Sequence, residues 1–214
     1  LVTEQVGEDR VVTGMIHFIS YQTPLHHPPG WARSRKARWE TKRPEPGVAF
    51  YLPPMAKGPF AGATRHAEAV VRALRAGGFP AKVDPGVNRK SKLGSSALMP
   101  VIATLEHAGW RFGAMRRGDT LPIALRAARE AMAVIGQREN HRLPAWRHLL
   151  RPMTVRLGLA VGAWWLPFDL EVYLAYHFTK VGDQTRLMLD EFQAEARRCG
   201  LPHTHLNQLS ARLD

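Results

Sequence analysis

A short run late in the chain concentrates polar side chains. His177, Lys180 and Gln184 are separated by three and four residues, so on one continuous helix they would share a face. An imidazole, an ammonium and an amide on one face can hold a carboxylate. The alternative is an ordinary charged helix surface, interrupted near Gly182, with Asp183 as the N-cap of the following helix.

Two lysines, Lys90 and Lys92, are the second group that could do chemistry. A lysine ammonium can stabilise negative charge that develops on a carbonyl oxygen, and it can then donate a proton to that oxygen. This chemistry suits the reduction of a carbonyl group. The alternative is that both lysines are solvated residues leading into a helix.

Two pairs of histidines raise the question of a metal. They are His26-His27 and His203-x-His205. Neither pair has an acid or a cysteine nearby that completes a standard ligand set, and Cys199 is the only cysteine of the chain. We therefore expect no metal site.

The charge balance is strongly basic. Thirty Lys and Arg against eighteen Asp and Glu give a net charge of +12 and an isoelectric point near 10.7. Such a surface attracts nucleic acid, anionic membranes, nucleotide phosphates or carboxylates. Trp31 and Trp39 lie among basic residues, as in single-strand-binding surfaces, but only Arg33–Arg43 forms a dense basic run. We expect no nucleic-acid partner.

Composition indicates a globular chain in a reducing compartment. Hydrophobic residues make up 45% and charged residues 22%, which is typical of a folded domain. A single cysteine excludes an intrachain disulfide and fits the cytoplasm. Leu1–Arg10 lacks the apolar core of a signal peptide, and the most apolar stretch, Leu157–Phe168, is shorter than the roughly 20 residues that span a bilayer. We expect no membrane partner.

The first part of the chain has the pattern of an α/β unit. Runs rich in Val, Ile and Phe predict strands at Arg10–Ser20, Val48–Leu52 and Phe79–Val83. A turn over Pro53–Gly62 leads into a helix at residues 64–77, with Thr64 as its N-cap and Gly77 at its end. The order strand, strand, helix, strand is what the far edge of a nucleotide-binding domain would contain.

Helix signals repeat after Val87, with no convincing strand. Apolar residues recur at helical spacing over Leu98–Leu105 and Leu121–Ile135, and glycines follow both stripes. A segment from Pro144 to Trp165 should break near Pro152. Later helices are expected after the N-cap Asp169, at Gln184–Arg198, and from the cap Thr204 to Leu213.

Several segments resemble one known family. They are Gly7–Gly14 (GEDRVVTG) followed by Phe18 and Pro29-Gly30, the helix His66–Gly78, and the tail His177–Asp190 (HFTKVGDQTRLMLD) followed by Gly200-Leu-Pro202. Together they resemble the ketopantoate reductases (2-dehydropantoate 2-reductases). The tail is similar to that family's substrate-side helix and its Gly-x-Pro turn.

This resemblance implies a fold. It predicts the α/β remnant of a Rossmann-type nucleotide domain over residues 1–86 and an all-α helical domain over residues 87–214, mainly α overall. It also implies hydride transfer from NADPH to a 2-keto acid, whose keto group is polarised by a lysine at the start of the first helix of the helical domain.

The same resemblance assigns roles to residues. Lys92 and Lys90 are the catalytic candidates, and Ser96 stands where the family carries an asparagine one turn after the lysine. His177, Lys180 and Gln184 complete the predicted substrate-binding set. The register stays open by one residue, because alignment on Pro100 would place Ser91 at the lysine position. Two departures from the family are Met99, in place of a second asparagine, and Met188, near the place of its substrate-binding glutamate.

The resemblance also implies that the full-length enzyme uses NADP as its cofactor. The Gly-rich loop that would bind this cofactor is absent from this chain. The nearest match, Gly158–Gly162, has the wrong spacing and no preceding strand. The missing initiator methionine indicates a trimmed or partial chain. We expect a homodimer or an interdomain face built on Trp164, Trp165 and Phe168. The alternative function is a non-catalytic helical module for interaction or dimerisation.

Overall fold

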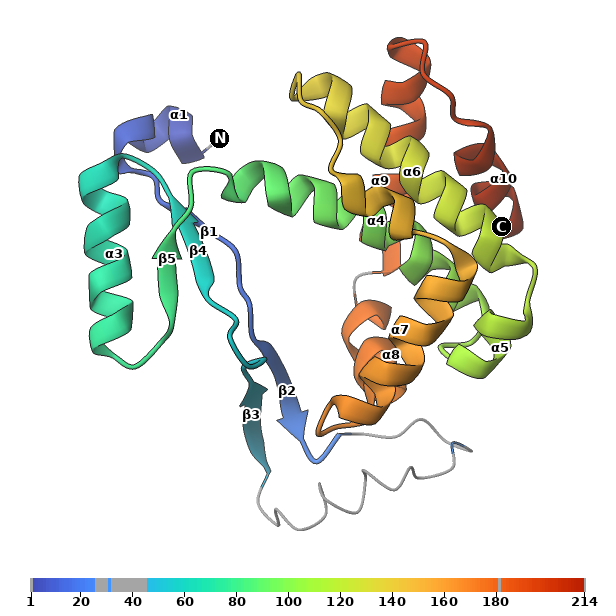
Figure 1. Ribbon diagram of the computed structural model, residues 1–214, viewed down its shortest axis with the longest axis horizontal. Coiled ribbons are helices and arrows are strands. Elements are labelled where there is room, and N and C mark those ends of the chain that lie inside the picture. The colour runs from blue at the N-terminus through green and yellow to red at the C-terminus, as the bar shows by residue number, and fades with distance from the viewer. Residues whose placement is uncertain (1, 26–30, 32–45, 181, 214) are drawn as a thin grey trace. The chain divides into compact units, whose positions relative to one another are not determined.

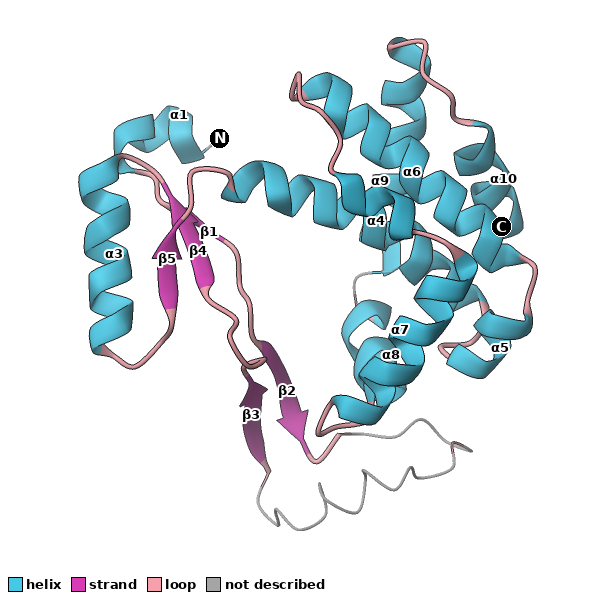
Figure 2. Ribbon diagram, viewed as in Figure 1, coloured by secondary structure: helices cyan, strands magenta, loops and turns pink. Residues whose placement is uncertain are grey.

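The structure is a computed structural model that describes residues 2–25, 31, 46–180 and 182–213. It is mainly helical, with short strands confined to the first part of the described chain (Figures 1 and 2). The prediction of a mainly α-helical protein is confirmed. The Rossmann-type origin of the first part stays a prediction, because the sheet there is small and mixed.

The chain divides into two compact units. One comprises Leu1–Tyr21 with Val48–Lys92, and the other comprises Gln22–Gly47 with Leu93–Asp214. The division therefore falls inside helix α4 (Val87–His107) and not just before it at residue 86. The described residues between Gln22 and Gly47 group with the second unit, although no feature of the sequence predicts this.

A three-stranded sheet forms the centre of the first unit. Its order is β1 (Thr13–Gly14), β4 (Gly58–Ala61), β5 (Ala81–Val83), with β1 antiparallel and β5 parallel to β4. Parallel neighbours need a crossover, and helix α3 (Thr64–Ala76) provides it. Figure 1 shows α3 lying alongside β5. A short helix α1 (Val2–Val6) and a 3-10 turn η1 (Glu8–Arg10) precede β1.

The predicted turn over residues 53–62 was wrong in part, because it contains strand β4. Gly58 and Pro59 disfavour strands locally, but tertiary pairing overrides that preference. Pro59 serves only as an acceptor, from the amide of Met15. A Cβ at Gly14 would collide with the Phe60 ring opposite it, so glycine fits this register.

The predicted strand at residues 10–20 is also different from the structure. It consists of β1 and the start of β2 (Ile19–Thr23), which pairs with β3 (Gly47–Tyr51) in a separate two-stranded sheet. The predicted strand at 48–52 is confirmed as β3. Helix α3 is also confirmed and ends at Gly77, but its N-cap is Ala63 and not Thr64.

Helix α6 (Thr120–Arg138) is the centre of the second unit. Every member of its predicted apolar stripe is buried, including Leu121, Leu125 and Met132. The helix continues through Gly136, where the Leu143 side chain and the His141 carbonyl leave little room for a Cβ. The helices of this unit that follow α4 are α5 (Phe112–Arg117), α6 (Thr120–Arg138), η2 (Ala145–Leu149), α7 (Pro152–Trp165), α8 (Leu170–Thr179), α9 (Gly182–Arg198) and α10 (Thr204–Leu213).

Several predicted helix boundaries are confirmed. Pro152 occupies the first turn of α7, and the Asp169 carboxylate accepts from the amides of Glu171 and Val172 at the start of α8. A break separates α8 from α9 at the predicted place, before Gly182. Leu98, expected in the apolar stripe of α4, is exposed.

Candidate functional site

Asp84 determines the position of one predicted catalytic lysine. Its carboxylate accepts from the Gly86 amide at 3.1 Å, at the turn between β5 and α4, and from the Lys90 ammonium at 2.6 Å. Lys82 approaches the same carboxylate at 3.3 Å. The hydrogen bond from Lys90 is the main reason that the pKa of Asp84 lies below its ordinary value. The ammonium of Lys90 is therefore engaged in closing the start of α4.

Lys92 and Ser96 stand one helical turn apart on α4 in very different environments. The Lys92 side chain is exposed, whereas Ser96 is fully buried and donates its hydroxyl to the Leu93 carbonyl at 2.9 Å. Ser95, three residues after Lys92, is half-exposed, and Asn88, four residues before it, is exposed. Helical spacing places both near Lys92. The sequence analysis named Ser96 and neither Asn88 nor Ser95, because alignment with the family directed it to Ser96.

His177, Lys180 and Gln184 do not share one helix. His177 lies on α8, Lys180 is the C-cap of α8, and Gln184 lies on α9. The imidazole of His177 stacks on Tyr173 at 5.5 Å, and the Lys180 ammonium lies 3.7 Å from the centroid of the Tyr176 ring. Among the described residues, no hydrogen bond or ion pair joins the three. Burial raises the pKa of the Tyr173 hydroxyl, which keeps it protonated.

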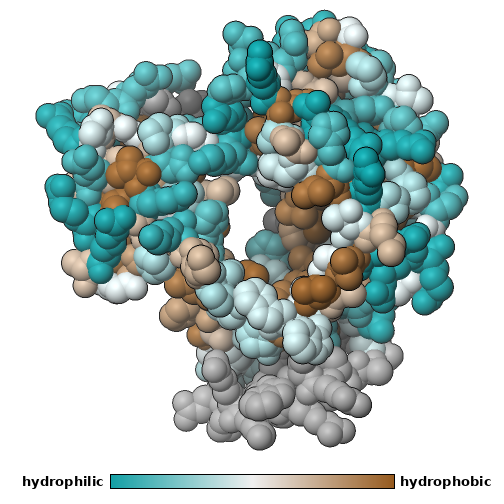
Figure 3. Space-filling view, viewed as in Figure 1, coloured by the Kyte–Doolittle hydropathy of each residue, from teal (hydrophilic) through white to brown (hydrophobic). Residues whose placement is uncertain are grey.

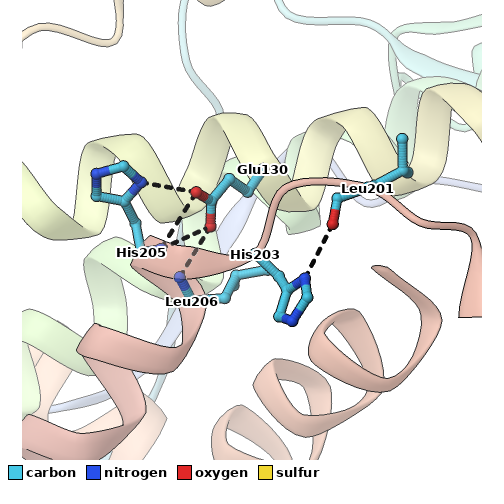
Figure 4. A network of polar contacts seen from close by, with 5 residues as sticks. All are labelled: Glu130, Leu201, His203, His205 and Leu206. Atoms are coloured by element: carbon cyan, nitrogen blue, oxygen red, sulfur yellow. Dashed lines mark hydrogen bonds and ion pairs between the residues drawn. The ribbon is translucent and has the colours of Figure 1, made fainter. Parts of the chain in front are cut away.

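One of the histidines near the C-terminus, His205, takes part in the capping of helix α10. Figure 4 shows the Glu130 carboxylate of α6 between the His205 imidazole, at 2.6 Å, and the amides of His205 and Leu206. His203 bonds instead to the Leu201 carbonyl. In the part of the chain that the structure describes, no group of three or more His, Cys, Asp or Glu could hold a metal ion. His26 and His27 lie outside the described residues.

The described residues do not fit a dinucleotide. A pyrophosphate needs closely spaced glycines between a strand and a helix N-terminus. Gly158 and Gly162 lie inside α7, and the turn from β4 to α3 has one glycine, Gly62, whose missing Cβ makes room for the Val11 carbonyl. We therefore assign no NADPH contact to these residues.

Comparisons of the chain with models of protein families, with curated proteins and with solved structures found no match. The similarity to ketopantoate reductases thus rests on the residues quoted above and stays a prediction.

A basic hollow lies in the first unit. It has a volume of about 490 Å³ and is lined by His17, Lys57 and Lys82 together with Pro53, Met55 and Ala56. Its lining side chains are exposed or half-exposed, and the His17 imidazole lies 2.9 Å from the Lys57 carbonyl. Two lysines give it a positive potential, but no buried polar group points to a specific ligand.

The aromatic cluster expected at an interface divides into two. Trp164 and Trp165 are 79% and 55% exposed, whereas Phe168 is fully buried against Tyr173. The interface prediction was therefore wrong for Phe168, because its side chain is buried among residues of the second unit. Figure 3 shows hydrophobic side chains at the surface where Figure 1 draws α7 and α8. Among the described residues, no helix is both long enough and apolar enough to cross a membrane.

The tryptophans and the basic run that the sequence places near residues 31–43 lie mostly outside the described residues. Trp39 and residues 33–43 are among the residues that are not described. The described Trp31 has the Arg111 guanidinium over its ring at 4.5 Å. That contact uses one face of the ring for a cation–π interaction within the second unit.

Proposed function

We propose that this chain belongs to a 2-keto-acid reductase related to the ketopantoate reductases, with Lys92 as the residue that polarises the keto oxygen. One observation supports the choice of residue: the Lys92 side chain is exposed near the start of α4, the helix on which the resemblance places the catalytic lysine. Asn88 and Ser95 flank Lys92 and replace Ser96 as the candidate substrate contacts.

The chemistry assigned to Lys92 is electrostatic and acid catalysis. Reduction adds a hydride to the keto carbon, and negative charge then develops on the keto oxygen. The ammonium stabilises that charge and donates a proton, which gives the 2-hydroxy acid; the exposed amine regains its proton from water. The proposal takes NADPH as the hydride donor from the resemblance alone.

Binding of a branched 2-keto acid, 2-oxoisovalerate, to this chain tests the proposal by NMR titration. Lys92→Gln should weaken binding several-fold, whereas Lys90→Gln, a matched change on the same helix, should leave it unchanged. Equal affinities for both variants would remove Lys92 from the site. Loss with Lys90→Gln alone would transfer the role to Lys90.

A second candidate function, self-association, is favoured by α7. Its outward side carries apolar residues at helical spacing: Met153, Leu157, Val161, Trp164 and Trp165, all more than half exposed. Gly158 lies on this side with open space around it, so a second helix can approach closely. We propose that two copies pair their α7 helices antiparallel, which places Arg151, at the start of one α7, near the negative C-terminal end of the other.

Sedimentation of the chain tests the pairing. Leu157→Lys should convert a dimer into a monomer, while Leu187→Lys, at a similarly exposed leucine of α9, should not. A monomeric parent chain would contradict the pairing.

For compartment, Cys199 is the one cysteine of the chain, and it is half-buried with its Sγ 3.7 Å from a Glu195 oxygen. No disulfide within the chain is required for the fold. We propose the cytoplasm as the site of action, which a fractionation experiment with the tagged gene product would test.

A further inference from the structure

A row of exposed apolar side chains in the second unit runs from η2 along the outward side of α7. Its members are all more than half exposed: Leu149 in η2, and Met153, Leu157, Val161, Trp164 and Trp165 in α7. Arg156 is the only charged residue of α7 itself. An apolar surface of this extent is rarely left in water, so a partner is expected to cover it.

Basic residues gather at the beginning of this row. From Arg138 to Arg156 the chain has five arginines and two histidines but only one acid, Glu139. Arg142 and Arg151 are exposed, and none of the ion pairs found among the described residues includes either of them. The Nε atom of Arg156 is buried without a hydrogen-bond partner in the described part of the chain. An anionic partner would neutralise these guanidinium groups.

Arg156 lies at the border of the row and not on the opposite side of α7. Val155 and Leu159 mark the inward side, because they pack against the buried cluster around Leu125. Arg156 follows Met153 by three residues, so helical geometry places it next to the row. An arginine at such a border can lay its methylene groups along apolar surface while its guanidinium reaches a charged headgroup.

The far end of the row carries two tryptophans, Trp164 and Trp165, which are 79% and 55% exposed. Tryptophan is enriched at the boundary between a bilayer and water. A helix that lies in the plane of that boundary has apolar and aromatic residues on one side and arginines beside them. Helix α7 has 14 residues, so at 1.5 Å per residue it is about 21 Å long, too short to cross a bilayer.

The charge of this region favours an anionic bilayer over the other partners. Two copies of the same surface would bring like charges together, whereas anionic headgroups neutralise them. A nucleic acid would neutralise the arginines but leave the apolar row in water. The expectation of no membrane partner considered spanning and signal segments, and contact in the plane of the bilayer surface needs neither.

We propose that η2 and α7 bind reversibly to an anionic phospholipid bilayer, with the apolar row in the interface and the arginines at the lipid phosphates. The proposal uses no residue of the reductase chemistry. It uses the same side of α7 as the antiparallel pairing, so a bilayer and a second copy compete for this surface.

Cosedimentation of the full chain with vesicles tests the proposal. The chain is diluted until sedimentation without lipid finds it monomeric, so that the surface is free. It should bind vesicles of phosphatidylcholine with phosphatidylglycerol, and at least about tenfold more weakly vesicles of phosphatidylcholine alone, because each arginine near an anionic surface contributes roughly fivefold. Added salt should weaken the binding. Absence of binding, or equal binding to both kinds of vesicle, overturns the proposal.

Two matched pairs of variants separate a specific surface from attraction by net charge. Leu157→Asp should weaken vesicle binding about tenfold or more, whereas Leu187→Asp, the same change at a similarly exposed leucine of α9, should leave it within about twofold. Arg151→Gln should weaken it about fivefold, and Arg197→Gln, at an exposed arginine of α9, less than about twofold. Equal losses within either pair overturn the proposal.

Brominated lipids give a measurement that does not depend on these substitutions. Bromine quenches nearby tryptophans, so such vesicles should quench the fluorescence of the parent chain, and Trp164→Phe with Trp165→Phe should reduce the quenching. Undiminished quenching would place another part of the chain in the bilayer and overturn the proposal. Sedimentation without lipid tests the pairing, and the 2-oxoisovalerate titration tests Lys92, so the three proposals can fail separately.

Discussion

Replacing Glu130 should destabilise the second unit more than any exposed acidic substitution. Its side chain is 10% exposed and accepts from three groups at the start of α10: the His205 amide at 3.0 Å, the Leu206 amide at 2.9 Å and the His205 imidazole at 2.6 Å. Losing a helix cap costs about 1 kcal/mol, and hydrogen bonds to a charged group contribute about 1.5–3 kcal/mol each. These contributions overlap, so Glu130→Ala should cost about 2–4 kcal/mol of unfolding free energy.

Urea and thermal unfolding provide the measurement. For a chain of this size, the expected loss corresponds to a fall in melting temperature of roughly 5–15 °C. Glu130→Gln keeps one carbonyl acceptor and should lie between the parent and the alanine variant. Glu191→Ala, at an exposed acidic residue of α9, is the control and should stay within about 0.5 kcal/mol of the parent.

Hydrogen exchange locates the effect. In Glu130→Ala the amides of His205 and Leu206 should exchange faster, because they lose their acceptor. Equal stability of the Glu130→Ala and Glu191→Ala variants, with unchanged protection of these amides, would refute the view that this carboxylate docks α10 on α6.

Three further predictions concern Asp84, the aromatic residues Phe168 and Trp164, and the binding of NADPH. The pKa of Asp84 is lowered in the folded state, so its carboxylate contributes to stability above about pH 4, and this contribution is lost as the pH falls through the folded pKa. Lys90→Gln should reduce the pH dependence of the unfolding free energy in that range. An unchanged pH dependence would contradict the pairing of Asp84 with Lys90. Phe168→Ala should cost about 3–5 kcal/mol in urea unfolding because the ring is fully buried, whereas Trp164→Ala should cost under about 1 kcal/mol, and the reverse order would mean that the Trp164 ring is buried in solution. This chain should bind NADPH no tighter than roughly millimolar and with strong salt dependence, since only scattered basic residues attract it; tight binding in physiological salt by calorimetry would mean that a dinucleotide site was overlooked.

Local signals in the sequence predicted the helical elements well. Asp169 as an N-cap, Gly77 at a helix end and the apolar stripe of α6 are local or periodic features, and all three are found in the structure. The strand β4 was missed because Gly58 and Pro59 have no local preference for a strand. Its pairing with β5, across the whole of α3, is a tertiary contact that no short window contains.

Local sequence patterns also failed to predict the environments of single side chains in the candidate sites. Spacing placed Lys92 and Ser96 one turn apart, which is correct for the backbone, but it could not reveal that one side chain is exposed and the other buried. Thr204 was expected to cap α10, whereas the carboxylate of Glu130, on another helix, accepts from its first amides. Capping by a distant residue leaves no trace in the local sequence.

The break between α8 and α9 divides the polar run at residues 177–186 between two helices. On a continuous helix His177, Lys180 and Gln184 would have formed one face, and a carboxylate site there would have followed from spacing alone. Because α9 restarts at Gly182, Thr185 and Arg186 fall in its first turn and line a cavity with the end of α4, while Lys180 remains with Tyr176 on α8. The structure therefore separates the three side chains that the spacing linked, and it does not bring them together on one helix face.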